Sequence, residues 1–187
     1  MNRVGKSAIC RSTVGLALAV GLLPLTATAA SSETGNGAHV FAGQLRDLQL
    51  ATDEALDGAT ARLTMANHQG SSTFVLNVKG VDVTGPDSAA GHVFGAHLHL
   101  GPCVEGNGAA ALAHYNTDVL AGVTPPAIDQ STEAWLDFTV TADGTGNAVA
   151  HVPFVPAPGA RSIVIHRDAT NELGVAGPRL ACLPVVW

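Results

Sequence analysis

The fold is most readily predicted from residues 95–103, Gly95-Ala96-His97-Leu98-His99-Leu100-Gly101-Pro102-Cys103. Polar and apolar residues alternate here, which predicts a β-strand, because successive side chains of a strand point to opposite faces. His97 and His99 would share one face, with their α-carbons about 6.6 Å apart, while Leu98 and Leu100 would face a core. Two histidines alone are also typical of a solvated strand face, so a metal site requires further histidines from elsewhere in the chain.

The first thirty residues have the features of a secretory signal peptide. Arg3, Lys6 and Arg11 are basic, residues 14–25 are apolar, and Ala27-Thr28-Ala29 is a small-residue cleavage motif. The apolar run is too short for a transmembrane helix, and no second apolar span follows. We therefore expect residues 1–30 to be removed and the remainder to be secreted, periplasmic or associated with the cell envelope. Residues 31–37 are expected to form a flexible terminus, and residues 38–187 one domain.

The chain beyond this leader is acidic. The leader holds three of the nine basic residues and none of the fifteen acidic ones, so residues 31–187 have a formal charge of −9. An acidic surface argues against nucleic acid and against anionic lipid as partners.

Cys103 and Cys182 are the two cysteines beyond the leader. In an oxidising compartment they are expected to form one disulfide. Their spacing of 79 residues corresponds to a stabilisation of up to about 4.5 kcal/mol in the chain-entropy description.

Short alternating segments between turn residues predict an all-β domain, a Greek-key β-barrel or sandwich. The pattern becomes strand-like from Ala38, with a mixed apolar run at residues 39–45, and further strands are expected over residues 59–66, 73–81, 95–99, 135–142, 148–154, 162–166 and 180–187. Residues 67–72 and 143–146 contain glycines that predict tight connections. Helical periodicity is absent except for a short piece near residues 109–113.

Four of the eight histidines lie in settings that favour a metal site. His97 and His99 share a strand face, His114 lies in a loop, and His166 ends a strand, from which it could approach the same face. Three or four imidazoles without a sulfur ligand suit copper(II) or zinc, and the absence of a free thiolate argues against a blue-copper site. The remaining histidines are expected to be solvated or structural: His39, His68, His92 and His151.

Arg179 is expected to lie near this site. It precedes Cys182 by three residues, and Cys103 follows His99 by four, so a disulfide would bring the arginine toward the histidines. The alternative is a surface arginine paired with one of the many acids. Beside a metal in an acidic protein, one basic group would attract a small anion.

Four motifs resemble those of the copper/zinc superoxide dismutase family. Gly95-Ala96-His97-Leu98-His99 resembles the family's Gly-Phe-His-Val-His, and His114-Tyr115-Asn116 resembles its His-Phe-Asn. Val164-Ile165-His166 resembles Val-Val-His, and Gly177-Pro178-Arg179-Leu180-Ala181-Cys182 resembles Gly-Ser-Arg-Leu-Ala-Cys. The motifs follow the family's order, and the ordered set is more specific than any one of them.

The resemblance implies a Greek-key β-barrel with a copper site. His97, His99 and His166 would bind copper, and His114 would occupy the position that bridges copper and zinc. Arg179 would guide the anion, and the two cysteines would form the family's disulfide. The implied activity is conversion of superoxide to dioxygen and hydrogen peroxide, with His114 passing a proton to the second superoxide.

Two departures from the family resemble its copper-only branch. Residues 115–139 contain no histidine, and Leu136 lies where the family has a zinc-binding aspartate, so zinc is not expected. The segment between His166 and Arg179 is also shorter than the family's electrostatic loop.

Without zinc, another group must orient the His114 ring. Glu172 is the candidate, because Asn171-Glu172-Leu173-Gly174 resembles the family's Asp-Leu-Gly region.

The sequence thus predicts a secreted, copper-dependent superoxide dismutase whose small-molecule partner is superoxide. One alternative is an extracellular copper-binding or scavenging domain with the same fold and little turnover, which the shortened loops favour and the retained Arg179 disfavours. A structural β-domain with vestigial histidines is a third reading. Nothing in the sequence specifies an oligomeric state.

Overall fold

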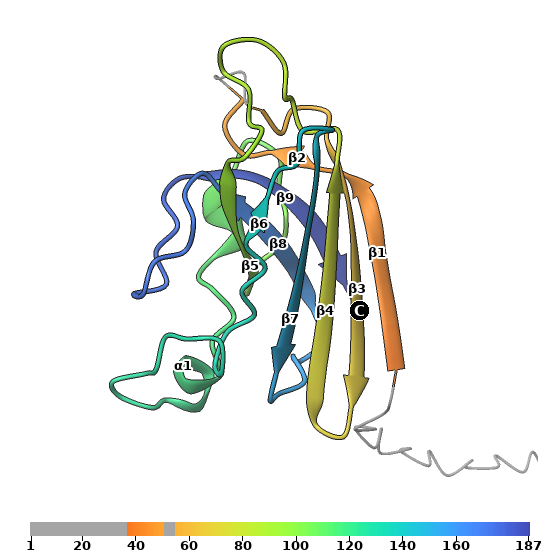
Figure 1. Ribbon diagram of the computed structural model, residues 1–187. Coiled ribbons are helices and arrows are strands. Elements are labelled where there is room, and N and C mark those ends of the chain that lie inside the picture. The colour runs from red at the N-terminus through yellow and green to blue at the C-terminus, as the bar shows by residue number, and fades with distance from the viewer. Residues whose placement is uncertain (1–36, 51–54) are drawn as a thin grey trace, which may run out of the picture. The chain divides into compact units, whose positions relative to one another are not determined.

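Two antiparallel β-sheets face one another and enclose the main apolar core (Figure 1). The computed structural model describes residues 37–50 and 55–187, all of which belong to one unit. The expected signal peptide lies outside the described residues, as does the expected flexible terminus except for Gly37, which begins the first strand. No helix within the described residues is long and apolar enough to cross a membrane.

The first sheet has four strands and the second has five. In spatial order the first contains β1 (Gly37–Gln44), β3 (Thr60–His68), β4 (Ser71–Lys79) and β7 (Thr145–Val152). The second contains β2 (Arg46–Asp47), β9 (Arg179–Val186), β8 (Ala160–His166), β5 (Val93–His99) and β6 (Phe138–Thr139). Two short helices lie in the connections, η1 (Gly108–Ala111) and α1 (Thr117–Ala121). The all-β sandwich predicted from the sequence is confirmed.

Alternation along the strands builds the core, as β3 and β4 illustrate. Leu63 of β3 lies opposite Leu76 of β4, and Met65 lies opposite Phe74, and all four side chains are fully buried. The intervening residues of β3 point outward. Such cross-strand apolar pairs fix the register, since a slip by one residue would expose all of them. Gln69 and Gly70 join the two strands with positive φ angles of 48° and 83°, as a two-residue hairpin requires.

The second sheet is buried on both faces. Ile163 and Ile165 of β8 contribute to the main core, whereas Val164 points the other way. There it packs with Cys103 and Cys182 in a smaller apolar cluster beneath residues 100–112. This covered outer face is the one on which the site is built.

The expected strand at residues 135–142 is largely wrong. Only Phe138–Thr139 forms a strand, β6, although Leu136, Phe138 and Val140 are buried as their alternation predicts. The edge of β5 that this segment follows is shared with a second segment, residues 113–115, so neither pairs along its whole length. The helix α1 was not expected, and Asn116 begins it by accepting a hydrogen bond from the Val119 backbone N–H at 3.0 Å.

Candidate metal centre

Strand β5 turns His97 and His99 toward the outer face of the five-stranded sheet. Its alternate residues Ala96 and Leu98 belong to the main core, so the two histidines necessarily face the other way. Both imidazoles are nevertheless fully buried, because the segments that follow β5 and β8 cover this face, where the Leu112 carbonyl contacts His99 and the Thr170 hydroxyl contacts His97.

The two edges of β5 supply the other two histidines. On one edge, β8 pairs with β5 in a register that sets His166 opposite Gly95. On the other, residues 113–115 run beside residues 98–100, and His114 forms an isolated bridge with His99. Paired residues on neighbouring strands project on the same face, so all four imidazoles meet there.

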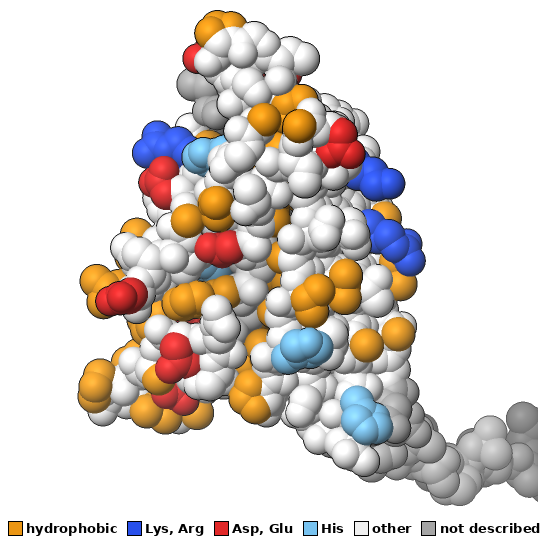
Figure 2. All heavy atoms as spheres, viewed as in Figure 1, with side chains coloured by type: hydrophobic (Ala, Val, Ile, Leu, Met, Phe, Trp, Pro, Cys, Tyr) orange, Lys and Arg blue, Asp and Glu red, His pale blue; other side chains and the backbone are white. Residues whose placement is uncertain are grey.

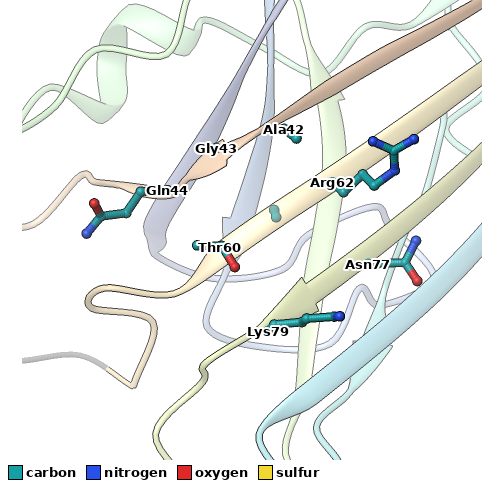
Figure 3. Close-up of a pocket in the computed structure, with 8 residues that line it drawn as sticks. Ala42, Gly43, Gln44, Thr60, Arg62, Asn77 and Lys79 are labelled. Carbon is teal, nitrogen blue, oxygen red and sulfur yellow. The ribbon is translucent and has the colours of Figure 1, made fainter.

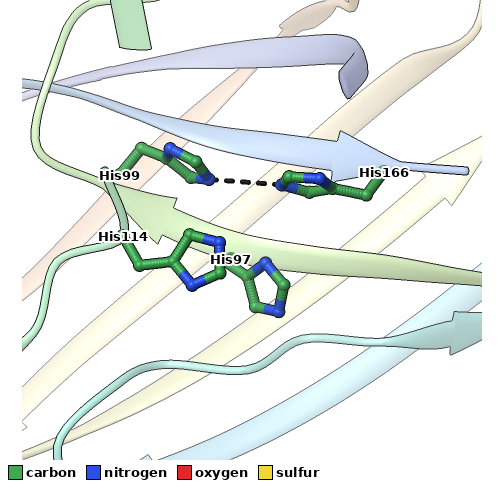
Figure 4. A group of neighbouring side chains, drawn as sticks. All are labelled: His97, His99, His114 and His166. Atoms are coloured by element: carbon green, nitrogen blue, oxygen red, sulfur yellow. Dashed lines mark hydrogen bonds between the residues drawn. The ribbon is translucent and has the colours of Figure 1, made fainter. Parts of the chain in front are cut away.

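The four rings converge on one point (Figure 4). One nitrogen from each of His97, His99, His114 and His166 lies within 4.8 Å of the others, and this is the only such group of metal-ligating side chains in the described part of the chain. His114 is the most exposed of them, with 18% of its side chain accessible. The open side of the cluster therefore lies at His114.

Each ring has its outward nitrogen occupied by a fixed acceptor. His99 Nδ1 donates to the Leu112 carbonyl and His166 Nδ1 to the Gly177 carbonyl, both at 3.1 Å. A carbonyl can only accept, so both rings carry their proton on Nδ1 and present an unprotonated Nε2 inward. These two Nε2 atoms lie 3.3 Å apart (dashed line in Figure 4), where their lone pairs would repel unless a cation lay between them.

Thr170 and Asp137 fix the His97 ring in the same way. The Thr170 hydroxyl donates to Asp137 Oδ1 at 2.7 Å, so its oxygen accepts from His97 Nε2–H at 2.7 Å. Asp137 also accepts from the backbone N–H groups of Thr170 and Ala96. His97 Nδ1 is left buried without any hydrogen-bond partner in the structure. A buried polar atom without a partner is costly in a protein and calls for an ion or water, so the donor set fits a metal.

The carboxylate of Glu133 orients the His114 ring. Glu133 Oε2 accepts from His114 Nδ1 at 2.9 Å and from Trp135 Nε1 at 2.9 Å, and Oε1 accepts from Asn116 Nδ2 at 2.9 Å. Burial opposes ionisation of this carboxyl, but the three hydrogen bonds outweigh it and hold the pKa of Glu133 below its ordinary value. His114 therefore presents Nε2 to the cluster while an anion holds Nδ1.

Burial and mutual repulsion keep the central rings neutral. Desolvation, followed by repulsion from the neighbouring histidines, lowers the pKa of His97 to about 2. Desolvation, with repulsion from His114 and Arg179, lowers the pKa of His99 to about 2. Burial likewise lowers the pKa of His166. Neutral imidazoles with free lone pairs are the form that binds a metal ion.

Arg179 is joined to the cluster through one backbone atom. Its NH2 group donates to the Leu112 carbonyl at 2.6 Å, the same oxygen that accepts from His99 Nδ1, and its NH1 group donates to the Gly108 carbonyl at 2.6 Å. The Cys103–Cys182 disulfide ties the segment that carries both carbonyls to β9. The sequence argument that the disulfide draws Arg179 toward the histidines thus agrees with the structure.

The carboxylate that contacts His114 is Glu133, and not Glu172 as the sequence predicted. Glu172 is exposed on the loop that precedes β9, and the contact expected of it is made by Glu133. The backbone N–H groups of Leu173 and Val175 both donate to Asn171 Oδ1, a turn that leaves Glu172 on the outside. Outside the cluster lie the other described histidines: His39, His68, His92 and His151.

The sequence matches no protein-family model, and it matches no curated protein. Among solved structures, the chain is similar to a double mutant of a SOD-like protein from Bacillus subtilis, with a TM-score of 0.51 and 18% identity over 78% of this chain and 97% of that one. It is also similar to the clock protein EA4, with a TM-score of 0.51 and 13% identity over 80% of this chain and 92% of that one. The fold is therefore superoxide dismutase-like, and it carries a cluster of four histidines that could hold a metal ion.

Proposed function

We propose that this chain is a copper-dependent superoxide dismutase that acts outside the cytoplasm. The observation that carries the proposal is the set of four inward imidazole nitrogens, all within 4.8 Å of one another, including the partnerless His97 Nδ1. When bound, copper would supply the one-electron chemistry by which two superoxide anions become dioxygen and hydrogen peroxide. The disulfide supports an oxidising compartment.

The surroundings of the cluster favour copper without zinc. A second metal at His114 would need its Nδ1, and that nitrogen is already hydrogen-bonded to Glu133. Glu133 is in turn enclosed by Asn116 and Trp135, neither of which offers an imidazole or thiolate for zinc. The resemblance to the copper-only branch, drawn from residues 115–139, agrees with this arrangement.

Arg179 is suited to attract the substrate anion. Its guanidinium is partly buried, and desolvation lowers its pKa, yet an arginine remains charged at neutral pH. Two carbonyl acceptors hold it in one orientation beside the segment that supports His99. In a chain of net negative charge, this cation gives the approaching superoxide a local attraction.

The test is to load the purified, disulfide-intact chain with Cu(II) alone and measure superoxide consumption. We expect one copper and no stoichiometric zinc per chain, together with catalysis. Arg179→Ala should retain copper but slow the reaction at low salt by at least about tenfold, with a smaller loss at high salt. A folded, copper-replete chain without turnover would contradict the enzyme and leave the scavenging alternative, and one tightly held zinc per copper would contradict the zinc-free site.

Glu133→Gln should weaken Cu(II) binding by about 10- to 100-fold, as loss of a carboxylate behind a metal-binding histidine does. The amide cannot accept hydrogen bonds at both ends, so one of the three donors around it loses its partner. The measurement is competitive Cu(II) titration of the apoprotein. Glu172→Gln is the matched control and should bind Cu(II) as tightly as the unmodified chain does. If Glu172→Gln instead weakened Cu(II) binding more than Glu133→Gln, Glu172 and not Glu133 would be the residue that orients His114.

A further inference from the structure

The cations of the described residues fall into two groups. Four have partners: Arg46 and Arg161 donate to the carbonyls of Cys103 and Leu100, Arg179 donates to Gly108 and Leu112, and Arg167 pairs with Asp168. The other two, Arg62 of β3 and Lys79 of β4, are exposed and make no hydrogen bond or ion pair with any residue that the structure describes. A surface cation without a partner is available to a ligand.

Both free cations line one groove, on the outer face of the four-stranded sheet (Figure 3). The groove has a volume of about 660 Å³. Strand register sets its floor as two rows, Ala42–Arg62–Asn77 and Gln44–Thr60–Lys79. Arg62 and Lys79 are diagonal neighbours across β3 and β4, about 7–8 Å apart at the backbone. Two amides and one hydroxyl therefore lie beside two unneutralised positive charges.

No carboxylate offsets these charges on the sheet itself. The four strands β1, β3, β4 and β7 contain no Asp or Glu, although the chain has fifteen. In Figure 2 most of the acidic side chains on the visible face lie over the loops at the left, away from the strands at the right. The molecule is thus acidic overall, but the strands of this sheet carry two cations and no carboxylate.

We propose that this groove binds an acidic polysaccharide, a polymer of sugars that carry carboxylate groups. Arg62 and Lys79 would pair with its carboxylates, and Gln44, Asn77 and Thr60 would hydrogen-bond its hydroxyl groups. The groove is lined by no large apolar side chain, only by Ala42, Gly43 and Ala61 besides the polar groups, so it does not suit insertion into lipid. Its function would be to hold the protein at a polyanionic matrix, independently of the metal centre on the other sheet.

The experiment is affinity electrophoresis of the full chain, without its leader, in gels containing polygalacturonate, with neutral dextran as the reference polymer. Polygalacturonate should retard the protein and dextran should not, and raising the salt from about 20 to about 200 mM should weaken binding at least tenfold. Arg62→Gln and Lys79→Gln should each weaken binding, and the double variant should lose at least tenfold in affinity. Arg167→Gln, which removes one exposed cation elsewhere, is the matched control and should bind as the unmodified chain does.

Ala42→Leu separates binding in a groove from diffuse electrostatic attraction, because Ala42 lies in the outward row with Arg62 and Asn77, and a larger side chain there would fill the groove without changing the charge. It should weaken polymer binding, while Cu(II) titration of the same variant verifies folding. The proposal is overturned if the double variant binds no worse than Arg167→Gln, or if Ala42→Leu has no effect while anionic phosphatidylglycerol vesicles bind equally well. The proposal is also overturned if the unmodified chain binds no polymer but self-associates, and if the double variant abolishes this self-association. The groove would then bind a second copy of the chain.

Discussion

Metal-free protein should lose about 4 kcal/mol of folding stability between pH 7.5 and pH 5. His97 and His99 each have a pKa of about 2 in the folded chain, against about 6.5 when unfolded. Below pH 6.5 the unfolded chain therefore binds two protons that the folded chain excludes, and the free energy of unfolding falls as the pH falls. Each ring contributes about 2 kcal/mol by pH 5, and the loss continues down to the folded pKa. His166, whose pKa is also lowered, adds to it.

Denaturant unfolding of the apoprotein across this range measures the effect. The copper-loaded chain is the control, since a bound metal competes with protons for the same nitrogens and should keep the protein stable to lower pH, until copper is released. His99→Gln should reduce the slope of stability against pH, because one of the excluded protons is gone. An apoprotein whose stability is flat between pH 7.5 and pH 5 would contradict the burial of neutral imidazoles.

Removing the disulfide with Cys103→Ala and Cys182→Ala should lower the free energy of unfolding by up to about 4.5 kcal/mol, because the bridge closes a 79-residue loop in the unfolded chain. It should also weaken Cu(II) binding. The bridge ties residues 100–112 to β9, and that segment supplies the carbonyls that hold His99 and Arg179.

Denaturant unfolding and Cu(II) titration of the same sample test both effects. Reduced, alkylation-free wild-type protein is the matched control, since reduction opens the loop while both sulfur atoms remain in the small core with Leu48, Ala111 and Val164. If the variant and the reduced protein lose equal amounts of unfolding free energy and of Cu(II) affinity, both losses come from opening the loop and not from removing the sulfur atoms. A loss of less than about 1 kcal/mol in both would contradict the prediction.

The histidine cluster was predictable from the sequence because its parts are local. A His-X-His pair on an alternating strand shares a face whatever the rest of the fold does, and His166 ends a strand of β-branched residues whose type is unambiguous. The cysteine spacing linked Arg179 to the same region.

The groups behind the histidines could not be predicted in the same way. Glu133 reaches His114 because residues 134–136 and 113–115 share one edge of β5, an arrangement fixed by tertiary register. Family resemblance favoured Glu172 instead, but a turn centred on Asn171 directs that residue outward. Thr170 touches His97 for a similar reason, since Asp137 anchors its loop from 33 residues earlier in the chain.

The Leu112 carbonyl has a consequence for how this protein could change. One oxygen accepts from both His99 and Arg179, in a leucine whose backbone has the unfavourable angles φ 59° and ψ −152°. In the proposed enzyme, metal retention and anion attraction would therefore not be independent: a substitution that shifts this one atom would alter both together. For the proposed enzyme to accept another anion, changes near Arg179 would have to leave the Leu112 carbonyl in place and alter residues that contact Arg179 alone.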